Sequence, residues 1–228
     1  MSIDNPAPGA DGVHIDLVLP CLNEARALPW VLDRVPEGVR AIVVDNGSTD
    51  GSPEIARRLG AAVVHCETRG YGAACHVGLQ AATAEFVAFC DCDASIDPFE
   101  VIRFARPVQH GWAEMSVARR RPTSLGAWPL HARLANKEVA RRFRRASGVP
   151  LSDVGPLRLA RREALLELPI RDRRSGYPLE TVLRAVQAGW RLEQIDVDYR
   201  PRSGRSKVTG TARGTLQAIR DMSGVLSS

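Results

Sequence analysis

The sequence predicts an α/β fold in a single domain, with a mostly parallel central sheet flanked by helices. Over residues 14–90, short apolar runs alternate with segments of helical periodicity, which is typical of βαβ units. Polar and turn-forming residues follow each apolar run, at the sheet edge where parallel sheets usually bind ligands. A chain of 228 residues with 44% hydrophobic and 25% charged residues has the size and composition of one globular domain.

The elements of the first half follow from apolar runs bounded by turn residues. A strand is expected from His14 to Leu19, ended by Pro20, and helical spacing follows over 24–34. After these we expect a strand at 40–44, a helix at 53–59, a strand at 61–65, a helix over 69–82 and a strand at 86–90.

The second half is less regular and rich in arginine. Its expected elements are a helix at 101–108, a strand at 113–118, an amphipathic helix at 130–145, an extended piece at 154–159, helices at 161–168 and 177–188, a strand at 191–199 and a helix at 211–226. The stretch 200–210 is polar, basic and contains glycine, so we expect a mobile loop there. Residues 1–12 are polar and rich in Pro and Gly, which predicts a flexible tail.

Two aspartates one residue apart, Asp91 and Asp93, follow the apolar strand at 86–90. In an extended chain, residues i and i+2 point to the same face, so the two carboxylates would converge. They would repel each other unless a cation lay between them, and Mg²⁺ or Mn²⁺ shared with a diphosphate suits such a pair. The alternative is a plain acidic loop in which Asp97-Pro98 begins the next helix.

Polar residues follow the other three predicted strands as well. They are Asn23-Glu24 after the first strand, Asp45 after the second and Arg69-Gly70 after the third. Meeting beyond the carboxyl ends of the strands, they fit a nucleotide, with Asp45 at the base or ribose and the metal at the diphosphate. The chain has no G-x-G-x-x-G after the first strand and no G-x-x-x-x-G-K-[ST], which disfavours dinucleotide oxidoreductases and P-loop enzymes.

The formal net charge of +5 is concentrated in the second half, in arginine runs such as 119–121, 141–145 and 171–174. Such a bias suits an anionic partner, although a solvated helix face would explain part of the run at 141–145. Aromatic residues are only 5% of the chain and none alternates with the basic runs, so we expect no nucleic-acid partner.

The five cysteines all lie between Cys21 and Cys92 and form no C-x-x-C pair. We therefore expect reduced core thiols in a cytoplasmic protein. No run of 18 apolar residues occurs, and the first residues lack the charged and apolar regions of a signal peptide, so no membrane span or signal is expected.

Taken together, these stretches make the chain resemble a family 2 glycosyltransferase of the GT-A fold, and most of all the branch of dolichyl- and polyprenyl-phosphate sugar synthases. The matching stretches occur in family order. They are Leu19-Pro-Cys-Leu-Asn-Glu24, Val43-Val-Asp-Asn-Gly-Ser-Thr-Asp50, Arg69-Gly-Tyr-Gly-Ala-Ala74, Phe89-Cys-Asp-Cys-Asp-Ala-Ser95, Asp153-Val-Gly-Pro-Leu-Arg158, Gly176-Tyr-Pro-Leu-Glu180 and Arg202-Ser-Gly-Arg-Ser-Lys-Val208.

The resemblance implies inverting transfer of a sugar from a nucleoside-diphosphate sugar, bound by residues 13–118, to an acceptor held by residues 119–228. Asp91 and Asp93 would hold the metal, with Asp93 the principal ligand. Ser95 stands where lipid-phosphate synthases carry a Gln, which puts a third protein ligand in doubt, and Asn46 stands where the family commonly has Asp. The implied donor-binding residues are Pro20, Asn23, Glu24, Asp45, Asn46, Arg69, Gly70, Asp91, Cys92, Asp93, Arg202 and Ser206.

On the acceptor side, the resemblance implies that Arg158 and the loop residues Arg205 and Lys207 hold the diphosphate or an acceptor phosphate. A phosphate acceptor is already ionised at neutral pH, whereas a hydroxyl acceptor needs a carboxylate to take its proton. Asp153 is the candidate for that base, and the alternative is a turn-forming or ion-paired Asp153.

A polyprenyl phosphate is the first choice of acceptor, because the second half is basic. A small-molecule hydroxyl is the alternative, because the chain has no hydrophobic anchor. Two other classes stay open: a sugar-phosphate nucleotidyltransferase, which would want a Gly-rich basic loop after the first strand, and a non-catalytic nucleotide-binding protein. We place the protein in the cytoplasm, with room for association with the inner face of the membrane and for a homodimer.

Overall fold

The computed structural model describes residues 14–204 and 224–225. The expected tail at 1–12, most of the loop at 200–210 and most of the helix at 211–226 lie outside the described residues, and so do Arg205, Ser206 and Lys207. Gly224 and Val225 are helical.

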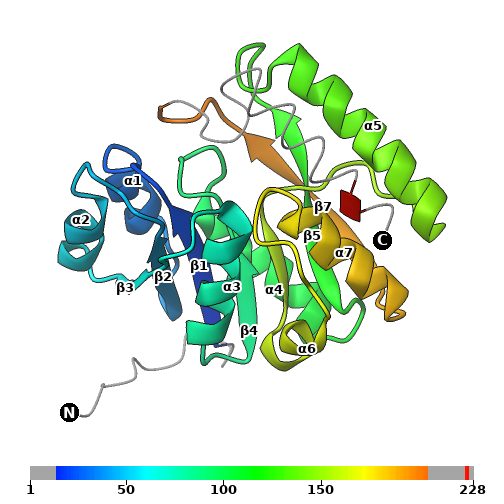
Figure 1. The fold of residues 1–228 in the computed structure, drawn as a ribbon, viewed down its shortest axis with the longest axis horizontal. Coiled ribbons are helices and arrows are strands. Elements are labelled where there is room, and N and C mark those ends of the chain that lie inside the picture. The colour runs from blue at the N-terminus through cyan, green and yellow to red at the C-terminus, as the bar shows by residue number, and fades with distance from the viewer. Residues whose placement is uncertain (1–13, 205–223, 226–228) are drawn as a thin grey trace.

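One sheet of seven strands forms the centre of the molecule (Figure 1), in the order β3-β2-β1-β4-β6-β5-β7. Its strands are β1 (Ile15–Cys21), β2 (Val39–Asp45), β3 (Ala62–His65), β4 (Phe86–Phe89), β5 (Met115–Pro122), β6 (Arg158–Arg161) and β7 (Leu192–Tyr199). Among the strands of the described residues, only β6 runs antiparallel to its neighbours β4 and β5, and the other strand pairs are parallel. The expectation of an α/β fold with a mostly parallel sheet is confirmed.

Helices cover both faces of this sheet. One face packs against α3 (Tyr71–Ala81), α5 (Leu130–Ser147), α6 (Arg162–Glu167) and α7 (Tyr177–Gln187). The other packs against α1 (Leu28–Asp33), α2 (Ser52–Arg58) and α4 (Val101–Gln109), which follows the short 3₁₀ turn η1 (Pro98–Glu100). Alternation along β1 supplies both cores, because Val18 joins the first and Leu17 and Leu19 join the second.

The first strand does not end at Pro20 but continues to Cys21. The carbonyl of Val18 accepts a hydrogen bond from Cys90 N on the β4 side, and the carbonyl of Cys21 accepts one from Asn46 N on the β2 side. Pro20, two residues after Val18, therefore faces the β4 side, where the paired residues end at Val18 and Phe89. A proline is tolerated there because its missing N–H has no ladder partner to lose.

Three further elements differ from the sequence prediction. The helix expected at 24–34 is a turn until Leu28. The strand expected at 113–118 continues to Pro122 through three arginines, and the extended piece expected at 154–159 becomes a strand only at 158–161. The arginines fit the strand because their side chains alternate, with Arg120 pairing with Asp153 on one side and Arg119 and Arg121 with Asp196 on the other.

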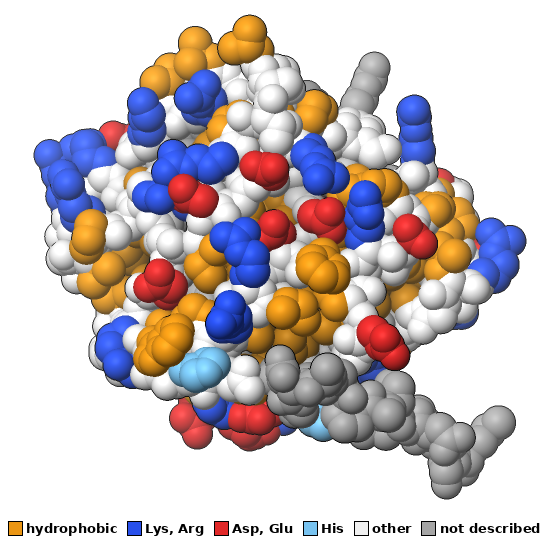
Figure 2. Space-filling view, turned by 180° about the vertical axis from the view of Figure 1, so that it is seen from behind, with side chains coloured by type: hydrophobic (Ala, Val, Ile, Leu, Met, Phe, Trp, Pro, Cys, Tyr) orange, Lys and Arg blue, Asp and Glu red, His pale blue; other side chains and the backbone are white. Residues whose placement is uncertain are grey.

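The basic character of the second half is partly compensated in the folded chain. Figure 2 shows Lys and Arg side chains interspersed with acidic ones over much of the face opposite to that of Figure 1. Arg141 and Arg142 pair with Glu138 on α5, and Arg191 pairs with Glu114. The arginine runs are therefore only in part available to an anionic partner.

Within residues 14–204 and 224–225, no helix combines the length and apolar character needed to cross a membrane. The five cysteines are free and buried, as expected for core thiols.

Candidate active site

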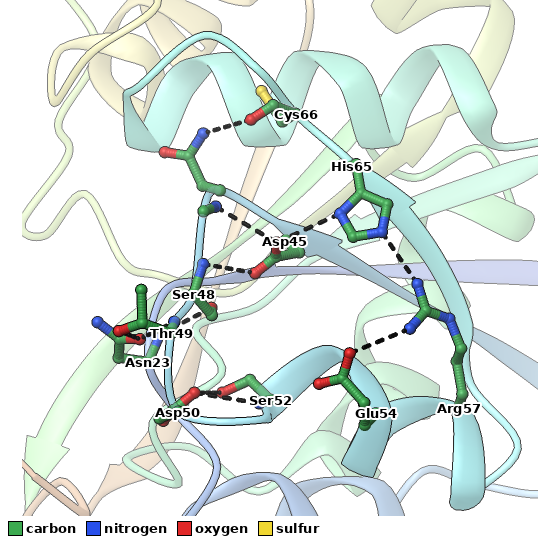
Figure 3. A network of polar contacts seen from close by, with 12 residues as sticks. Asn23, Asp45, Ser48, Thr49, Asp50, Ser52, Glu54, Arg57, His65 and Cys66 are labelled. Carbon is green, nitrogen blue, oxygen red and sulfur yellow. Dashed lines mark hydrogen bonds and ion pairs between the residues drawn. The ribbon is translucent and has the colours of Figure 1, made fainter.

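The loops that follow β1 and β2 are tied together at the carboxyl edge of the sheet (Figure 3). Asn23, at a positive φ of 55°, accepts a hydrogen bond from Thr49 N at 2.7 Å through its side chain, and its own N–H donates to Ser48 Oγ at 2.9 Å. Glu24 N donates to Ser52 Oγ at 2.9 Å. These contacts bring Asn23, Glu24 and the turn after Asp45 into one region, as the sequence predicts.

Asp45, the last residue of β2, is held as a buried hydrogen-bond acceptor. Its Oδ1 accepts from Ser48 N at 3.0 Å, and its Oδ2 accepts from Gly47 N at 3.4 Å and lies 3.3 Å from His65 Nδ1. Burial raises the pKa of Asp45, but the hydrogen bonds from Ser48, Gly47 and His65 outweigh it and leave the pKa below its ordinary value. Asp45 is therefore an ionised acceptor at neutral pH.

His65, at the end of β3, connects Asp45 to α2. Its Nε2 lies 2.9 Å from a guanidinium nitrogen of Arg57, which in turn forms an ion pair with Glu54 (Figure 3). Because an arginine only donates, Nε2 accepts this bond and the ring proton lies on Nδ1, facing Asp45. His65 is not among the residues predicted from the sequence, although it ends a strand at the same edge as they do.

Asn46 links the loop after β2 to the loop after β3. Its Nδ2 donates to the carbonyls of Cys66 and Thr68 at 3.1 and 2.7 Å, and its Oδ1 accepts from Gly70 N at 2.8 Å. Asn46 is 6% exposed and its amide makes bonds within the protein, so the structure gives it a positioning role. Gly70 is required here because its φ is 148° and a Cβ would lie 2.2 Å from the carbonyl oxygen of Arg173.

Asp91 and Asp93 lie at the exit of β4, where the charge of Asp93 acts on the carboxyl group of Asp91. Tyr71 OH donates to Asp91 Oδ1 at 2.9 Å, and the chain then turns through Ala94, whose φ is 63°. Burial, and next the charge of Asp93, raise the pKa of Asp91 to about 6. A divalent cation bound beside Asp91 would favour its ionised form.

Asp93 is engaged by the chain that follows β7. Its Oδ2 forms an ion pair with Arg202 at 2.9 Å, its Oδ1 accepts from Ser95 N at 3.0 Å, and its carbonyl accepts from Ser203 N at 2.8 Å. A second backbone bond, from Arg200 N to Ser95 O at 2.8 Å, holds the same segment against the acidic turn. Arg202 therefore lies at the predicted metal-binding residue.

The donor set suits a hard divalent cation that is shared with a substrate. Carboxylate oxygens are the ligands Mg²⁺ and Mn²⁺ prefer, and Asp93 already binds a positive group. Among the described residues, no cluster of three or more His, Cys, Asp or Glu could hold a metal. Asp91 and Asp93 would thus need further oxygens from a diphosphate or water.

Arg158 lies inside the protein rather than on its surface. It is 1% exposed, its Nη1 donates to Gly155 O at 3.0 Å, and its guanidinium lies over the ring of Phe89. Its Nε and Nη2 have no hydrogen-bond partner, and neither does the buried hydroxyl of Tyr177. The charge of Arg158 favours the ionised form of Asp91, so it belongs to the electrostatic surroundings of the site. Binding of a phosphate by Arg158 stays a prediction.

Asp153, the candidate base, is in a buried ion pair. It is 2% exposed, and Arg120 donates to its two oxygens from Nε at 2.9 Å and Nη2 at 2.6 Å. The Arg120 guanidinium also lies over the rings of Trp128 and Tyr199. Of the two roles that the sequence leaves open for Asp153, the ion-paired one is therefore observed. Its role as a base stays a prediction.

The remaining predicted residues differ in what they contribute. Cys92, expected to bind the donor, instead buries its side chain in the core, in the same cluster of buried residues as Cys21. Pro20 is half-buried at the end of β1, and exposed Arg69 places its guanidinium beside Gly47. Tyr71, which the sequence analysis did not assign, contacts Asp91.

Known proteins resemble this chain over most of its length. The family model for Glycosyl transferase family 2 matches residues 16–168. An uncharacterized glycosyltransferase of Mycobacterium tuberculosis (strain ATCC 25618 / H37Rv) is 46% identical over 95% of this chain and 99% of the relative. Dolichyl-phosphate hexose transferase of Haloferax volcanii is 29% identical, covering 87% of this chain and 88% of the relative.

Among solved structures, glucosyl-3-phosphoglycerate synthase of Mycobacterium tuberculosis has the same fold. Its complex with Mn²⁺, uridine diphosphate and glucosyl-3-phosphoglycerate superposes with a TM-score of 0.76 at 23% identity, covering 94% of this chain and 79% of the other. Another crystal of that enzyme holds Mg²⁺ and uridine diphosphate. The two ions in those crystals are the two that the sequence of the present chain suggests.

Proposed function

This chain belongs to glycosyl transferase family 2, and we propose that it transfers a sugar from a nucleoside-diphosphate sugar to an acceptor that carries a phosphate group. The observation that carries this proposal is the position of Asp91 and Asp93 at the exit of β4, beside the tied loops of β1 and β2. A nucleoside would lie against Asp45, and its diphosphate would reach the acidic pair. Mg²⁺ or Mn²⁺, bound by Asp91 and Asp93, would stabilise the charge of the departing diphosphate.

We further propose that the donor carries a base with an imino N–H, such as uracil, thymine or guanine. Asp45 is ionised and so can only accept hydrogen bonds. An imino N–H would donate a hydrogen bond to the Asp45 carboxylate. The ring nitrogen of cytosine or adenine at the corresponding position carries no hydrogen, so it would be repelled by the carboxylate oxygen. Uridine diphosphate in the similar solved structures supports uracil as the first base to test.

In the proposed reaction the acceptor oxygen forms a bond to the anomeric carbon from the face opposite the diphosphate. The bond between that carbon and the diphosphate oxygen breaks, the diphosphate leaves with the electron pair, and the configuration inverts. A hydroxyl acceptor also gives up its proton, for which Asp153 is the candidate base, whereas an ionised phosphate acceptor has no proton to lose. Tyr71 orients Asp91 by donating to its Oδ1, and the Ser95 N–H orients Asp93. Arg202 is placed to add positive charge beside the leaving group.

We favour as the acceptor a small phosphorylated molecule whose hydroxyl oxygen attacks the anomeric carbon. The solved structures of the same fold support this choice, since those crystals hold phosphoglyceric acid or glucosyl-3-phosphoglycerate. The second candidate is a polyprenyl phosphate, which the sequence analysis placed first. It has support from the dolichyl-phosphate hexose transferase of Haloferax volcanii at 29% identity. The two acceptors share a phosphate group, and they differ in which oxygen attacks and in the need for a base.

The test is a transfer assay with Mn²⁺ and UDP-, GDP-, dTDP-, CDP- and ADP-sugars against two acceptor sets, phosphoglycerate-like molecules and short-chain polyprenyl phosphates. Donor binding is first measured from the melting temperature, where a ligand at 100 times its dissociation constant adds roughly 2.7 kcal/mol. Glycosylated product with either set, dependent on Mn²⁺, supports the proposal and identifies the acceptor class. Binding of no sugar nucleotide in the presence of Mn²⁺ would overturn it.

A further inference from the structure

The ion pair between Arg202 and Asp93 puts a positive group of the protein at the residue expected to bind the metal. The two side chains meet at 2.9 Å, with the carboxylate 8% exposed and the guanidinium side chain 30% exposed. Asp93 Oδ1 is meanwhile bonded to Ser95 N, so both of its oxygens are engaged. A cation that binds through Oδ2 must therefore compete with Arg202.

Arg202 is held in this position by its own backbone. The bonds from Arg200 N to Ser95 O and from Ser203 N to Asp93 O, both 2.8 Å, flank it on either side and set the segment 200–203 along the acidic turn. These backbone bonds therefore place Arg202 next to Asp93, so that its guanidinium can reach the carboxylate. Two flanking backbone bonds would stay in place if the side chain alone swung away.

The acidic pair offers a metal few ligands by itself. Among the described residues, no third His, Cys, Asp or Glu joins Asp91 and Asp93 in a cluster that could hold an ion. Mg²⁺ and Mn²⁺ take about six ligands, so most would come from water or from a diphosphate. A cation without a nucleotide would have to break the Arg202 ion pair and would gain few protein ligands in exchange. A cation that binds together with a diphosphate gains the diphosphate oxygens as ligands, and the diphosphate also gives the Arg202 guanidinium a new anionic partner.

We propose that Arg202 is the resident counterion of Asp93, which the metal displaces only together with a nucleotide diphosphate, so that metal and donor bind cooperatively. This inference rests on the proposed function, because it needs the metal to use Asp93 and the donor to carry a diphosphate. Before the donor binds, the Arg202 guanidinium pairs with the Asp93 carboxylate and so controls access of the metal to it. When metal and donor bind, the guanidinium moves from Asp93 to the diphosphate. Coupling of this kind is reciprocal, so the metal strengthens nucleotide binding by the factor by which the nucleotide strengthens metal binding.

The experiment measures Mn²⁺ affinity of the full chain, by paramagnetic resonance of free Mn²⁺ or by calorimetry, with and without saturating UDP. Arg202→Gln removes the positive charge that pairs with Asp93, and Arg200→Gln is the matched control. Arg200 lies two residues away and pairs at 3.8 Å with Asp97, which is not one of the two expected ligands. Both variants lower the net charge equally, and both keep the backbone bonds of the segment.

Without UDP, Arg202→Gln should bind Mn²⁺ on the order of tenfold more tightly than the wild type, because the competing charge is gone. With saturating UDP the difference should shrink to about twofold or reverse, so the coupling between Mn²⁺ and UDP falls by about fivefold or more. Arg200→Gln should match the wild type within about twofold in both conditions. Arg202→Lys, which keeps a positive charge, should fall between the wild type and Arg202→Gln and provides a second folded variant.

Unchanged or weaker Mn²⁺ binding by Arg202→Gln without UDP would overturn the inference. So would an equal gain with and without UDP, because that pattern indicates a long-range field and not occupation of Asp93. If the wild type binds no Mn²⁺ even with UDP, the metal site itself fails and the proposed function falls with it. The two failures are therefore distinguishable.

Discussion

Arg120 and Asp153 form a buried bidentate ion pair, closed by a third hydrogen bond from Arg120 N to Asp153 Oδ2 at 2.8 Å. The pair joins strand β5 to the loop that precedes β6, and Arg120 packs its guanidinium against Trp128 at 3.9 Å from the ring centre. A residue that the motif suggested for catalysis thus has a structural partner on a neighbouring strand. Its contribution to the fold and to the reaction can be separated by mutation.

Replacing Asp153 by Ala should lower the free energy of unfolding by about 3 kcal/mol, because it leaves the Arg120 charge buried without its partner. The measurement is urea unfolding followed by circular dichroism. The surface pair of Asp196 with Arg119 and Arg121 gives a matched control, and Asp196→Ala should cost less than about 1 kcal/mol. If Asp153→Asn unfolds like the wild type yet loses turnover, Asp153 acts as a base as well.

Removing the expected principal metal ligand should abolish metal-dependent chemistry. Asp93→Asn should reduce Mn²⁺-dependent transfer or donor hydrolysis by on the order of 10²-fold or more, since stabilisation of the leaving diphosphate is lost. Asp97→Asn, in the same acidic turn, is the control, because Asp97 accepts from Phe99 N and pairs with Arg34. Full activity of Asp93→Asn, or of the wild type in chelator, would remove the metal from the mechanism.

The pKa of Asp91 predicts opposite effects of acid on metal binding and on the metal-free fold. Burial and the charge of Asp93 raise this pKa to about 6, above the ordinary value of 3.8. Below about pH 6 the metal must therefore displace a proton, so the Mn²⁺ affinity measured with UDP should fall up to tenfold per pH unit. In the metal-free protein, Asp91 contributes stability when protonated, and this contribution is lost as the pH rises through 6.

The Asp91→Asn variant isolates both trends, because an amide does not titrate between pH 5 and 7. Subtracting its pH profile from that of the wild type leaves the contribution of Asp91 to Mn²⁺ affinity and to melting temperature. Identical profiles for the two proteins would show that Asp91 does not titrate in this range, contrary to the prediction.

Asp45 should set the preference for the nucleobase. The wild type should bind UDP roughly tenfold or more tightly than CDP, because an acceptor-only carboxylate rejects a base without an imino N–H. In Asp45→Asn the amide also donates, so this ratio should fall towards one. Glu54 is exposed and reaches Asp45 only through Arg57 and His65, so Glu54→Gln should leave the ratio of UDP to CDP binding unchanged. A wild type that binds CDP as well as UDP would contradict this assignment.

The sequence predicted strongly periodic elements well, because burial on two faces leaves a direct imprint on residue order. β2, β3 and α3 lie where the apolar runs and the Arg69-Gly70 start place them. The helix predicted at 24–34 is longer than the observed one, because backbone hydrogen bonds from Ala27 and Leu28 to Glu24 O form a turn that precedes α1. The strand predicted at 113–118 ends too early. The neighbouring sequence does not show that Arg119, Arg120 and Arg121 pair with carboxylates on the two sides of the sheet.

What the sequence determined by itself is the order of strands and helices and the acidic, amide and glycine residues at the strand ends. These follow from hydrophobic periodicity and turn chemistry, which act over a few residues. Only the tertiary structure decided which carboxylates are free and which are paired. Arg120 meets Asp153 across 33 residues, and Arg202 meets Asp93 across more than 100, because the sheet brings segments that are distant in the chain to one edge. Charge pairing depends on that distance in space, which residue order does not record.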